Sequence, residues 1–268
     1  MAITIPGIEL ANVVPGAVLL GADEKGVNET FKGFIDAASG RHGAYIKILG
    51  GRQLVNELIG TTVGRAVGLP IPQGYLLRVL PEDLPESVLL KNHGSEALAF
   101  GSRDIGEPSL TRRIKDNGDW VIDQLFSTWR EWDTAMIFDD WIANGDRHPG
   151  NLLVGKPGEV WLIDHSHSFT GPNWNEPDLI PDRMYQNQLG QARVPKLTLP
   201  ERMAVRTKAG QLSSTFGLVD PDLALTASFA DRLLNVSEVN TVSNFLQARA
   251  AKLIDVVSSR LGIPNLGV

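Results

Sequence analysis

The sequence has no cysteine and no long uninterrupted run of apolar residues. Without cysteine, the chain cannot be a disulfide-stabilised secreted module or a zinc protein with cysteine ligands. No signal peptide is expected, because the first basic residue is Lys25. The apolar stretch at residues 13–20 is interrupted by Pro15 and Gly16, and no other run approaches membrane-spanning length. We therefore expect a cytoplasmic protein without a transmembrane segment.

Neither sign of charge is in large excess. The chain has 31 acidic and 25 basic side chains, so its net charge is −6. This balance gives no general attraction to nucleic acid or to an anionic membrane, and a nucleic-acid partner is not indicated. Apolar residues make up 43% of the 268 residues, which is enough to bury the core of one large domain or of two lobes that share an interface.

Three polar residues in the middle of the chain have a spacing that a buried core does not require. Asp146 is followed five residues later by Asn151, and Asp164 comes after two apolar runs joined by a Pro-Gly turn. These runs, residues 152–154 and 160–163, predict a hairpin that returns Asp164 to the side of Asn151. Phosphoryl transfer needs a group that orients the attacking hydroxyl and oxygen ligands for Mg²⁺, and these residues supply both. The alternative is that they only cap turns.

A helix is predicted directly before this group. Apolar residues recur at helical spacing over residues 128–144, and the Asn144-Gly145 pair that follows is typical of a C-terminal cap. Asp146 is therefore expected to begin the loop between this helix and the hairpin.

A strand near the N-terminus carries a lysine. The alternation in residues 44–49 puts Lys47 on the opposite face from the isoleucines beside it. The next segment, residues 52–67, has the apolar spacing of a helix, and Glu57 is its only acidic residue. A strand lysine paired with a helical glutamate is the ion pair that kinases use to hold the lysine on nucleotide phosphates. The alternative is a solvent-exposed surface pair.

The remaining pattern divides the chain into a strand-rich part and a helical part. Residues 1–15 predict an arm or an edge strand, and beyond Pro108 the apolar spacing becomes helical, ending in an amphipathic helix with Ser237 as N-cap and Gly262 as its stop. Predicted strands cover residues 17–21, 30–35, 44–49, 75–80, 87–90 and 97–100. We therefore expect an α+β chain with a β-rich lobe over residues 1–105 and a mostly helical lobe over residues 106–268.

Two connections between predicted elements are candidate binding segments. The first contains Gly21, Lys25 and Gly26, whose backbone amides and charge could hold phosphate oxygens, although an ordinary tight turn would have the same composition. The second, residues 170–200, is long and rich in proline, and long ordered loops often bind substrates. Trp174 and Tyr185 within it could equally fasten this loop to the lobe.

The order Asp146-Arg147-His148 followed by Asn151 resembles the HipA-like kinases and the phosphoinositide kinases of the protein-kinase-like superfamily. Ordinary protein kinases place the histidine before the aspartate. The strand lysine with its helical glutamate, and the segment GLPIPQGYLL at residues 68–77, are also similar to HipA-like kinases. The resemblance extends over most of residues 14–169.

This resemblance implies a two-lobed protein-kinase-like fold that uses ATP and Mg²⁺. By that resemblance, Asp146 would be the base or orienter of the hydroxyl, and His148 would be a supporting residue near the phosphates. Asn151 and Asp164 would hold the metal. The nucleotide would be bound by Gly21, Lys25, Gly26, Lys47, Glu57, Ala99 and Gly101, and residues 101–105 would be the hinge whose backbone holds adenine.

The resemblance also limits two expectations. HipA toxins contact their antitoxin through an extra N-terminal subdomain, and only about fifteen residues precede the first regular strand predicted here, so an antitoxin partner is not expected. The Asp164-His165-Ser166 segment lacks the Phe-Gly of protein kinases, so regulation by a flip of that motif is not implied.

We expect phosphorylation of serine or threonine in a protein, with Thr30 and Ser39 as candidate sites of self-phosphorylation. Basic residues at positions 182–208 keep open a lipid or small-molecule acceptor, as in phosphoinositide kinases. A nucleotide-binding pseudokinase is a second alternative. A metal-dependent hydrolase that uses Asp139, Asp140, Asp146, His148 and His165 is the third.

Overall fold

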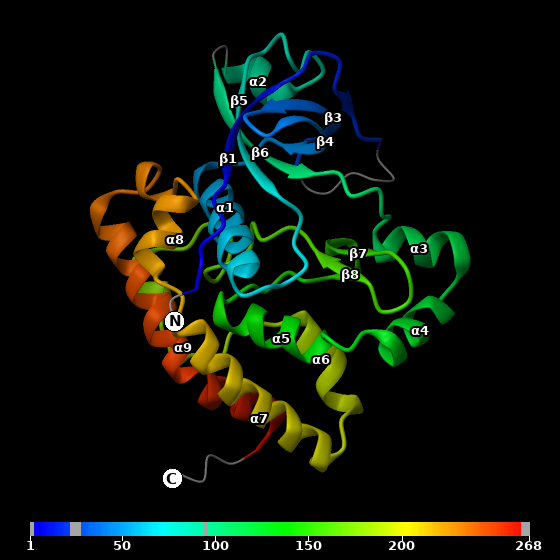
Figure 1. Cartoon of the computed structure of the whole chain (residues 1–268), viewed down its shortest axis with the longest axis vertical. Coiled ribbons are helices and arrows are strands. Elements are labelled where there is room, and N and C mark those ends of the chain that lie inside the picture. The colour runs from blue at the N-terminus through cyan, green and yellow to red at the C-terminus, as the bar shows by residue number, and fades with distance from the viewer. Residues whose placement is uncertain (1–2, 22–27, 94–95, 264–268) are drawn as a thin grey trace.

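The computed structural model describes residues 3–21, 28–93 and 96–263, and it has two lobes stacked along its longest axis (Figure 1). The N-terminal lobe is built on a sheet, and the C-terminal lobe is mostly helical. The predicted α+β class with a β-rich first lobe is therefore confirmed. Among the residues described, no helix has the length and apolar composition needed to cross a membrane.

The sheet of the first lobe has six strands. Their spatial order is β1 (Glu9–Val13), β5 (Gly74–Val79), β6 (Ala97–Arg103), β4 (Gly40–Lys47), β3 (Thr30–Ala37) and β2 (Val18–Leu19). β1 runs parallel to β5 and also pairs with β3. The sheet therefore curls until β1, at one end of the spatial order, meets β3, near the other end. One face buries an apolar cluster that includes Phe31, Ile46 and Leu77. The predicted strands at residues 17–21, 30–35, 44–49, 75–80 and 97–100 all fall in or overlap these strands.

Helix α1 (Gly51–Ala66) packs against the other face of the sheet through Leu54 and Leu58, which contact Leu76 and Phe100. Eleven consecutive residues of α1, from Leu54 to Gly64, are buried, because the helix lies between the sheet and the second lobe (Figure 1). A helix covered on all sides needs apolar or hydrogen-bonded side chains around its whole circumference. α1 is therefore the element that both lobes share.

The strand predicted at residues 87–90 is wrong, because these residues begin helix α2 (Val88–His93). The carboxylate of Glu29 accepts hydrogen bonds from the Val88 and Leu89 amides at 3.0 and 3.3 Å, and from the Ser87 hydroxyl. A carboxylate at this position satisfies the free amides of a helix N-terminus. A four-residue apolar run does not distinguish a strand from one helical turn.

The second lobe contains the hairpin formed by β7 (Leu152–Val154) and β8 (Val160–Leu162). Its core lies between α5, α7 and α9, where the rings of Trp141 and Phe216 stack with centroids 4.5 Å apart. The helices are α3 (Leu110–Asn117), α4 (Trp120–Thr128), α5 (Trp132–Trp141), α6 (Gln188–Arg193), α7 (Leu199–Phe216), α8 (Pro221–Ala227) and α9 (Val236–Leu261), with short 3-10 turns at Pro149–Asn151, Glu176–Asp178, Val194–Lys196 and Ala230–Arg232.

Two predicted helix boundaries differ from the structure. The helix expected over residues 128–144 is interrupted at Trp129, whose backbone is extended, and α5 ends at Trp141 before Ala143 adopts a positive φ of 50°. The N-cap of α9 is Asn235 and not Ser237, because the Asn235 side chain accepts from the Glu238 amide and the Glu238 carboxylate accepts from the Asn235 amide. Gly262 ends α9 in the left-handed region, as predicted.

The lobes are joined covalently between β6, which ends at Arg103, and α3, which begins at Leu110. They are also joined by contacts between residues far apart in the chain. The Ile8 amide donates to the carbonyl of Ala227, at the end of α8, at 2.9 Å. Arg52 at the start of α1 forms an ion pair of 2.6 Å with Glu238 of α9.

Candidate active site

The hairpin brings Asn151 and Asp164 together. Leu152 pairs with Leu162, and one step further the Ile163 amide donates to the Asn151 carbonyl at 3.1 Å. The side-chain amide of Asn151 donates to the backbone carbonyl of Asp146 at 2.6 Å. These contacts place Asp146, Asn151 and Asp164 at one end of the hairpin, as their spacing predicts.

Lys47 reaches this group from the other lobe. Its ammonium lies 2.7 Å from Oδ2 of Asp164, and the second carboxylate oxygen of Asp164 accepts from the Ser166 hydroxyl at 2.7 Å. Burial alone would raise the pKa of Asp164, but Lys47 and Ser166 outweigh it and hold that pKa below its ordinary value. Burial alone would likewise lower the pKa of Lys47, but the negative charges of Asp164 and Glu57 raise it. Both side chains are therefore charged at neutral pH.

Glu57 does not form the predicted ion pair with Lys47. Its Oε2 accepts a hydrogen bond from the backbone amide of His165, and the partner of Lys47 is Asp164. Glu57 is 2% exposed, and this burial raises the pKa of its carboxyl group to about 7, although the nearby charge of Lys47 opposes the shift. The glutamate therefore positions the segment that carries Asp164 and does not neutralise the lysine directly.

The raised pKa of Glu57 predicts a dependence of stability on pH. The unfolded group ionises near pH 4.5 and the folded group near 7, so the folded state holds a proton that the unfolded state releases between these values. The stability from this protonated group is complete below pH 4.5 and is lost as the pH rises through 7. Relative to Glu57→Gln, we expect the free energy of unfolding of the wild type to fall by about 3 kcal/mol between about pH 5 and about pH 8, measured by denaturant unfolding. A difference that does not change with pH would contradict this assignment.

Of the side chains of Asp146, Asn151 and Asp164, that of Asp146 is the most exposed. It is 37% exposed, and its Oδ1 accepts from the side-chain amide of Gln188 at 3.1 Å. Nδ1 of His167 lies 4.0 Å from its Oδ2. Sequence reasoning missed Gln188 and His167, because neither has a spacing from Asp146 that marks it. His148, which was expected near the phosphates, is exposed, and its Nδ1 accepts from the Gly150 amide at 2.9 Å within its own turn.

The backbone around Asp146 is held by a buried ion pair. The guanidinium of Arg147 is fully buried and contacts both carboxylate oxygens of Asp139 at 3.2 and 2.9 Å, and it also donates to the carbonyl of Ile163. Asn144 donates to the same carboxylate at 3.1 Å and accepts from the Asp146 amide at 3.2 Å. Arg147 therefore ties the loop of Asp146 to the strand that leads to Asp164.

Three of the residues of the hydrolase alternative, Asp139, Asp140 and His165, have other partners or are buried. Asp139 is committed to Arg147, and Asp140 is committed to Arg260, whose guanidinium approaches its oxygens at 2.6 to 3.1 Å. His165 is buried against Phe138 and against Gly60 of α1, and burial keeps its pKa well below its ordinary value. Among the residues described, no three His, Cys, Asp or Glu side chains form a cluster that could hold a metal ion.

Asn56 fastens α1 to the segment after Asp164. This fully buried side chain donates to the carbonyls of Ser166, Ser168 and Gly171 at 2.8 to 3.0 Å and accepts from the indole of Trp174 at 2.8 Å. Trp174 is also buried, so it fastens the long loop to the lobe, one of the two roles considered from the sequence. The sequence gives no sign of Asn56, because its partners are backbone carbonyls more than 100 residues away.

We expect Asn56→Ala to lower the free energy of unfolding by about 3 kcal/mol, because three backbone carbonyls, two of them buried, and one indole would each lose a partner. Denaturant unfolding measures the change. The matched control is Asn117→Ala, whose amide is exposed and donates only to the Arg113 carbonyl. A loss from Asn56→Ala no larger than that of the control would contradict the proposed anchor.

The predicted nucleotide contacts of the first lobe are only in part on the cleft side. Lys25 and Gly26 lie outside the described residues, and Gly21 lies directly before that gap. Ala99 is buried in the sheet core on the face away from α1, and a Cβ on Gly101 would meet Leu77 of that core. Ala99 and Gly101 thus present backbone, and not side chains, toward the cleft.

Tyr45, which sequence reasoning missed, shares the face of Lys47, because the two lie two residues apart on β4. Its hydroxyl accepts from the ammonium of Lys32 at 3.2 Å, and Lys32 forms an ion pair of 2.8 Å with Asp104, the residue after β6. This contact links the sheet to the connection between the lobes beside the cleft.

A β-rich lobe that presents a lysine to an Asp-Asn-Asp group in a helical lobe defines the two-lobed fold of kinases. A model of one family, described as "HipA-like kinase", matches residues 45–179, half of the sequence, and the chain belongs to this family. The crystal structure of a Helicobacter pylori proinflammatory kinase, CtkA, is similar to this structure with a TM-score of 0.53 over 95% of this chain and 98% of that chain, at 11% sequence identity. No curated protein matches the sequence.

Proposed function

We propose that this protein is an ATP- and Mg²⁺-dependent kinase that phosphorylates serine or threonine residues of proteins. The observation that carries the proposal is the contact of 2.7 Å between Lys47 and Asp164, which unites the two lobes where Asn151 and Asp146 also lie. In kinases the lysine contacts the nucleotide phosphates, and the aspartate and asparagine hold the metal. Membership in the HipA-like kinase family supports the same class of reaction.

The residues at this site fit a magnesium nucleotide. Mg²⁺ takes oxygen ligands, usually one or two from the protein, with phosphate oxygens and water completing the set. Asp164 is kept ionised by Lys47, and the amide nitrogen of Asn151 is engaged by the Asp146 carbonyl, so the carbonyl oxygen of Asn151 remains as a ligand. When bound, magnesium ATP supplies the phosphoryl group and neutralises its charge.

Three side chains of this protein would orient the acceptor, the phosphates and the metal ligand. Asp146, half-exposed and held by Gln188, can accept a hydrogen bond from an acceptor hydroxyl and align it. Lys47 places a positive charge where the phosphates must lie. Glu57 fixes the backbone of His165 and so the position of Asp164.

The basic residues at positions 182–208 favour a protein acceptor over a lipid, because most of them are engaged within the protein. Arg202 donates to the carbonyls of Leu197, Leu261 and Val194. Arg193, Arg206 and Lys208 contact Asp133, Ser258 and Glu131. A kinase that works at an anionic membrane needs free basic side chains on one face. A pocket of about 380 Å³ beside Trp174 and Arg183, in the long loop, supports peptide binding instead.

Incubation with labelled ATP and Mg²⁺, alone, with cell lysate and with phosphoinositide vesicles, tests the proposal. We expect label in protein bands. Of the two candidate self-phosphorylation sites, Thr30 is buried and Ser39 is exposed in the turn between β3 and β4, so label on this chain is expected at Ser39. Label in lipid alone would establish the phosphoinositide alternative. Nucleotide binding without transfer to any acceptor would establish the pseudokinase alternative.

A further inference from the structure

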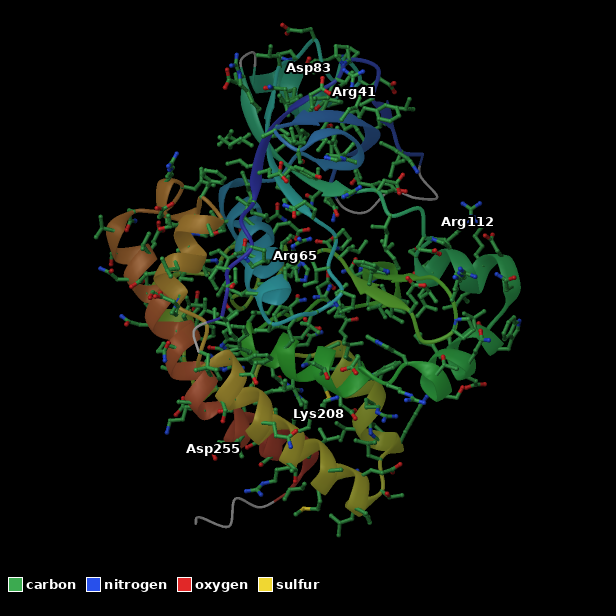
Figure 2. All side chains as sticks on the ribbon, viewed as in Figure 1. Arg41, Arg65, Asp83, Arg112, Lys208 and Asp255 are labelled. Carbon is green, nitrogen blue, oxygen red and sulfur yellow. The ribbon has the colours of Figure 1, made fainter. Side chains whose placement is uncertain are left out.

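A cavity lies at the connection between the lobes, lined in part by Arg103, Asp104 and Ile105 of that connection. It has a volume of about 680 Å³, which is in the range of small-molecule sites. Residues from both lobes line it, including Arg65 at the end of α1, Tyr75 of β5, Arg103 of β6 and Trp161 of β8. Arg65 is near the middle of the molecule (Figure 2).

The strand residues that line this cavity stand on the opposite face of the sheet from Lys47, whereas Arg65 reaches the cavity from the end of α1. Lys47 pairs with Phe100, whereas His42, Tyr75 and Arg103 stand at positions of the other alternation in the ladder. The strand side chains of this cavity therefore point away from the face that carries Lys47.

The two arginines in the cavity have no carboxylate partner among the described residues. Arg65 donates to the Ile71 carbonyl at 3.2 Å, while its Nε is buried and lacks any hydrogen-bond partner. Arg103 forms no ion pair with any described residue. A buried guanidinium nitrogen without an acceptor is unusual in proteins, and a bound anion is one of the groups that can satisfy it.

Neither carboxylate in the cavity forms an ion pair with these arginines, although the charge of Glu9 partly opposes the lowering of the Arg65 pKa by burial. Asp104 forms an ion pair with Lys32 at 2.8 Å and accepts from the Gly106 amide. Glu9 accepts from the Ser39 amide at 3.2 Å. The hydroxyl of Tyr75, a residue only 1% exposed, lies within the electrostatic reach of both arginines and of Glu9.

We propose that this cavity binds a small anionic molecule, whose phosphate or carboxylate group contacts Arg65 and Arg103 and whose flat apolar part lies against Trp161. Guanidinium groups bind the oxygens of such anions in pairs, and aromatic walls favour a planar ligand part. The proposal does not depend on the kinase activity proposed above.

Titration with phenyl phosphate, followed by calorimetry, tests this site. Benzoate and phenol are titrated for comparison. Benzoate carries a carboxylate in place of the phosphate, and phenol is a neutral ring. We expect the anions, and not phenol, to bind, and the affinity to fall at least about tenfold in Arg65→Gln and in Arg103→Gln. Tyr75→Phe should weaken binding less than either change of arginine.

Two controls assign the binding to this cavity. Arg41 lies on the β3–β4 hairpin, which also carries the cavity residues Ser39 and His42, but its side chain is 60% exposed and is paired with Asp36. Arg41→Gln should therefore leave the affinity unchanged. Lys47→Met should also leave it unchanged, because that residue lies on the other face of the sheet. Equal affinity in the double variant of Arg65 and Arg103, or loss of binding in Lys47→Met, would overturn the proposal. Circular dichroism and the unfolding midpoint establish that each variant is folded.

Discussion

Asp164→Asn is expected to abolish the rise in melting temperature that ATP with Mg²⁺ gives to the wild type. A ligand at about 100 times its Kd stabilises a protein by about 2.7 kcal/mol, and this whole amount should be lost. Asparagine is the informative replacement, because Asp164 has a φ of 61° and asparagine accepts the left-handed region with little strain. The change therefore removes the charge that a metal needs without rebuilding the backbone. Thermal unfolding with and without nucleotide measures it.

The control for this experiment concerns Lys47, which loses its partner in Asp164→Asn. An unpaired, largely buried ammonium destabilises the folded protein on its own. The double variant Lys47→Met with Asp164→Asn removes that charge and should recover part of the stability of the apoprotein, but it should show no response to nucleotide. A double variant that still responds to ATP would show that the nucleotide binds elsewhere.

Asp146→Asn should lower the rate of phosphoryl transfer by about a thousandfold with little change in stability or in nucleotide binding. The variant keeps the shape of the side chain and can still bond to Gln188, but it cannot accept the proton of an attacking hydroxyl. Single-turnover kinetics with labelled ATP measure the rate, and thermal unfolding with ATP measures binding. The matched control is Asp123→Asn, because Asp123 is an exposed residue of α4.

Unchanged turnover in Asp146→Asn would transfer the role to another group. His167 is the nearest candidate, since its Nδ1 lies 4.0 Å from Oδ2 of Asp146. The variant His167→Ala is assayed beside Asp146→Asn. Loss of turnover would identify His167 as the base, and unchanged turnover would show that it only lies beside Asp146.

The sequence predicts the Asp146, Asn151 and Asp164 group well because its geometry is local. A short hairpin has one register that buries its apolar residues, so the positions of Asn151 and Asp164 follow from the pattern of residues 152–163. The two-lobed division follows equally, because the apolar spacing changes from strand to helix near Pro108.

Other parts of the site depend on contacts that a one-dimensional pattern does not encode. Glu57 was expected to meet a side chain, but its partner is the backbone amide of His165, 108 residues away, and every residue except proline has such an amide. Gln188 and Asn56 are ordinary polar residues until the chain brings Asp146 and the carbonyls of Ser166 to them. The strand predicted at residues 87–90 became a helix because Glu29, distant in sequence, caps it.

The contacts of α1 determine which parts of this molecule can move together. Asn56 and Glu57 bond the helix to the segment after Asp164, and Arg52 bonds it to α9. The helix is therefore joined to the C-terminal lobe by directional polar contacts, even though it belongs to the N-terminal half of the chain, and to the sheet by the apolar packing of Leu54 and Leu58. Because apolar packing is not directional, we expect any opening of the cleft to shift the sheet relative to α1 before it breaks the polar contacts of α1.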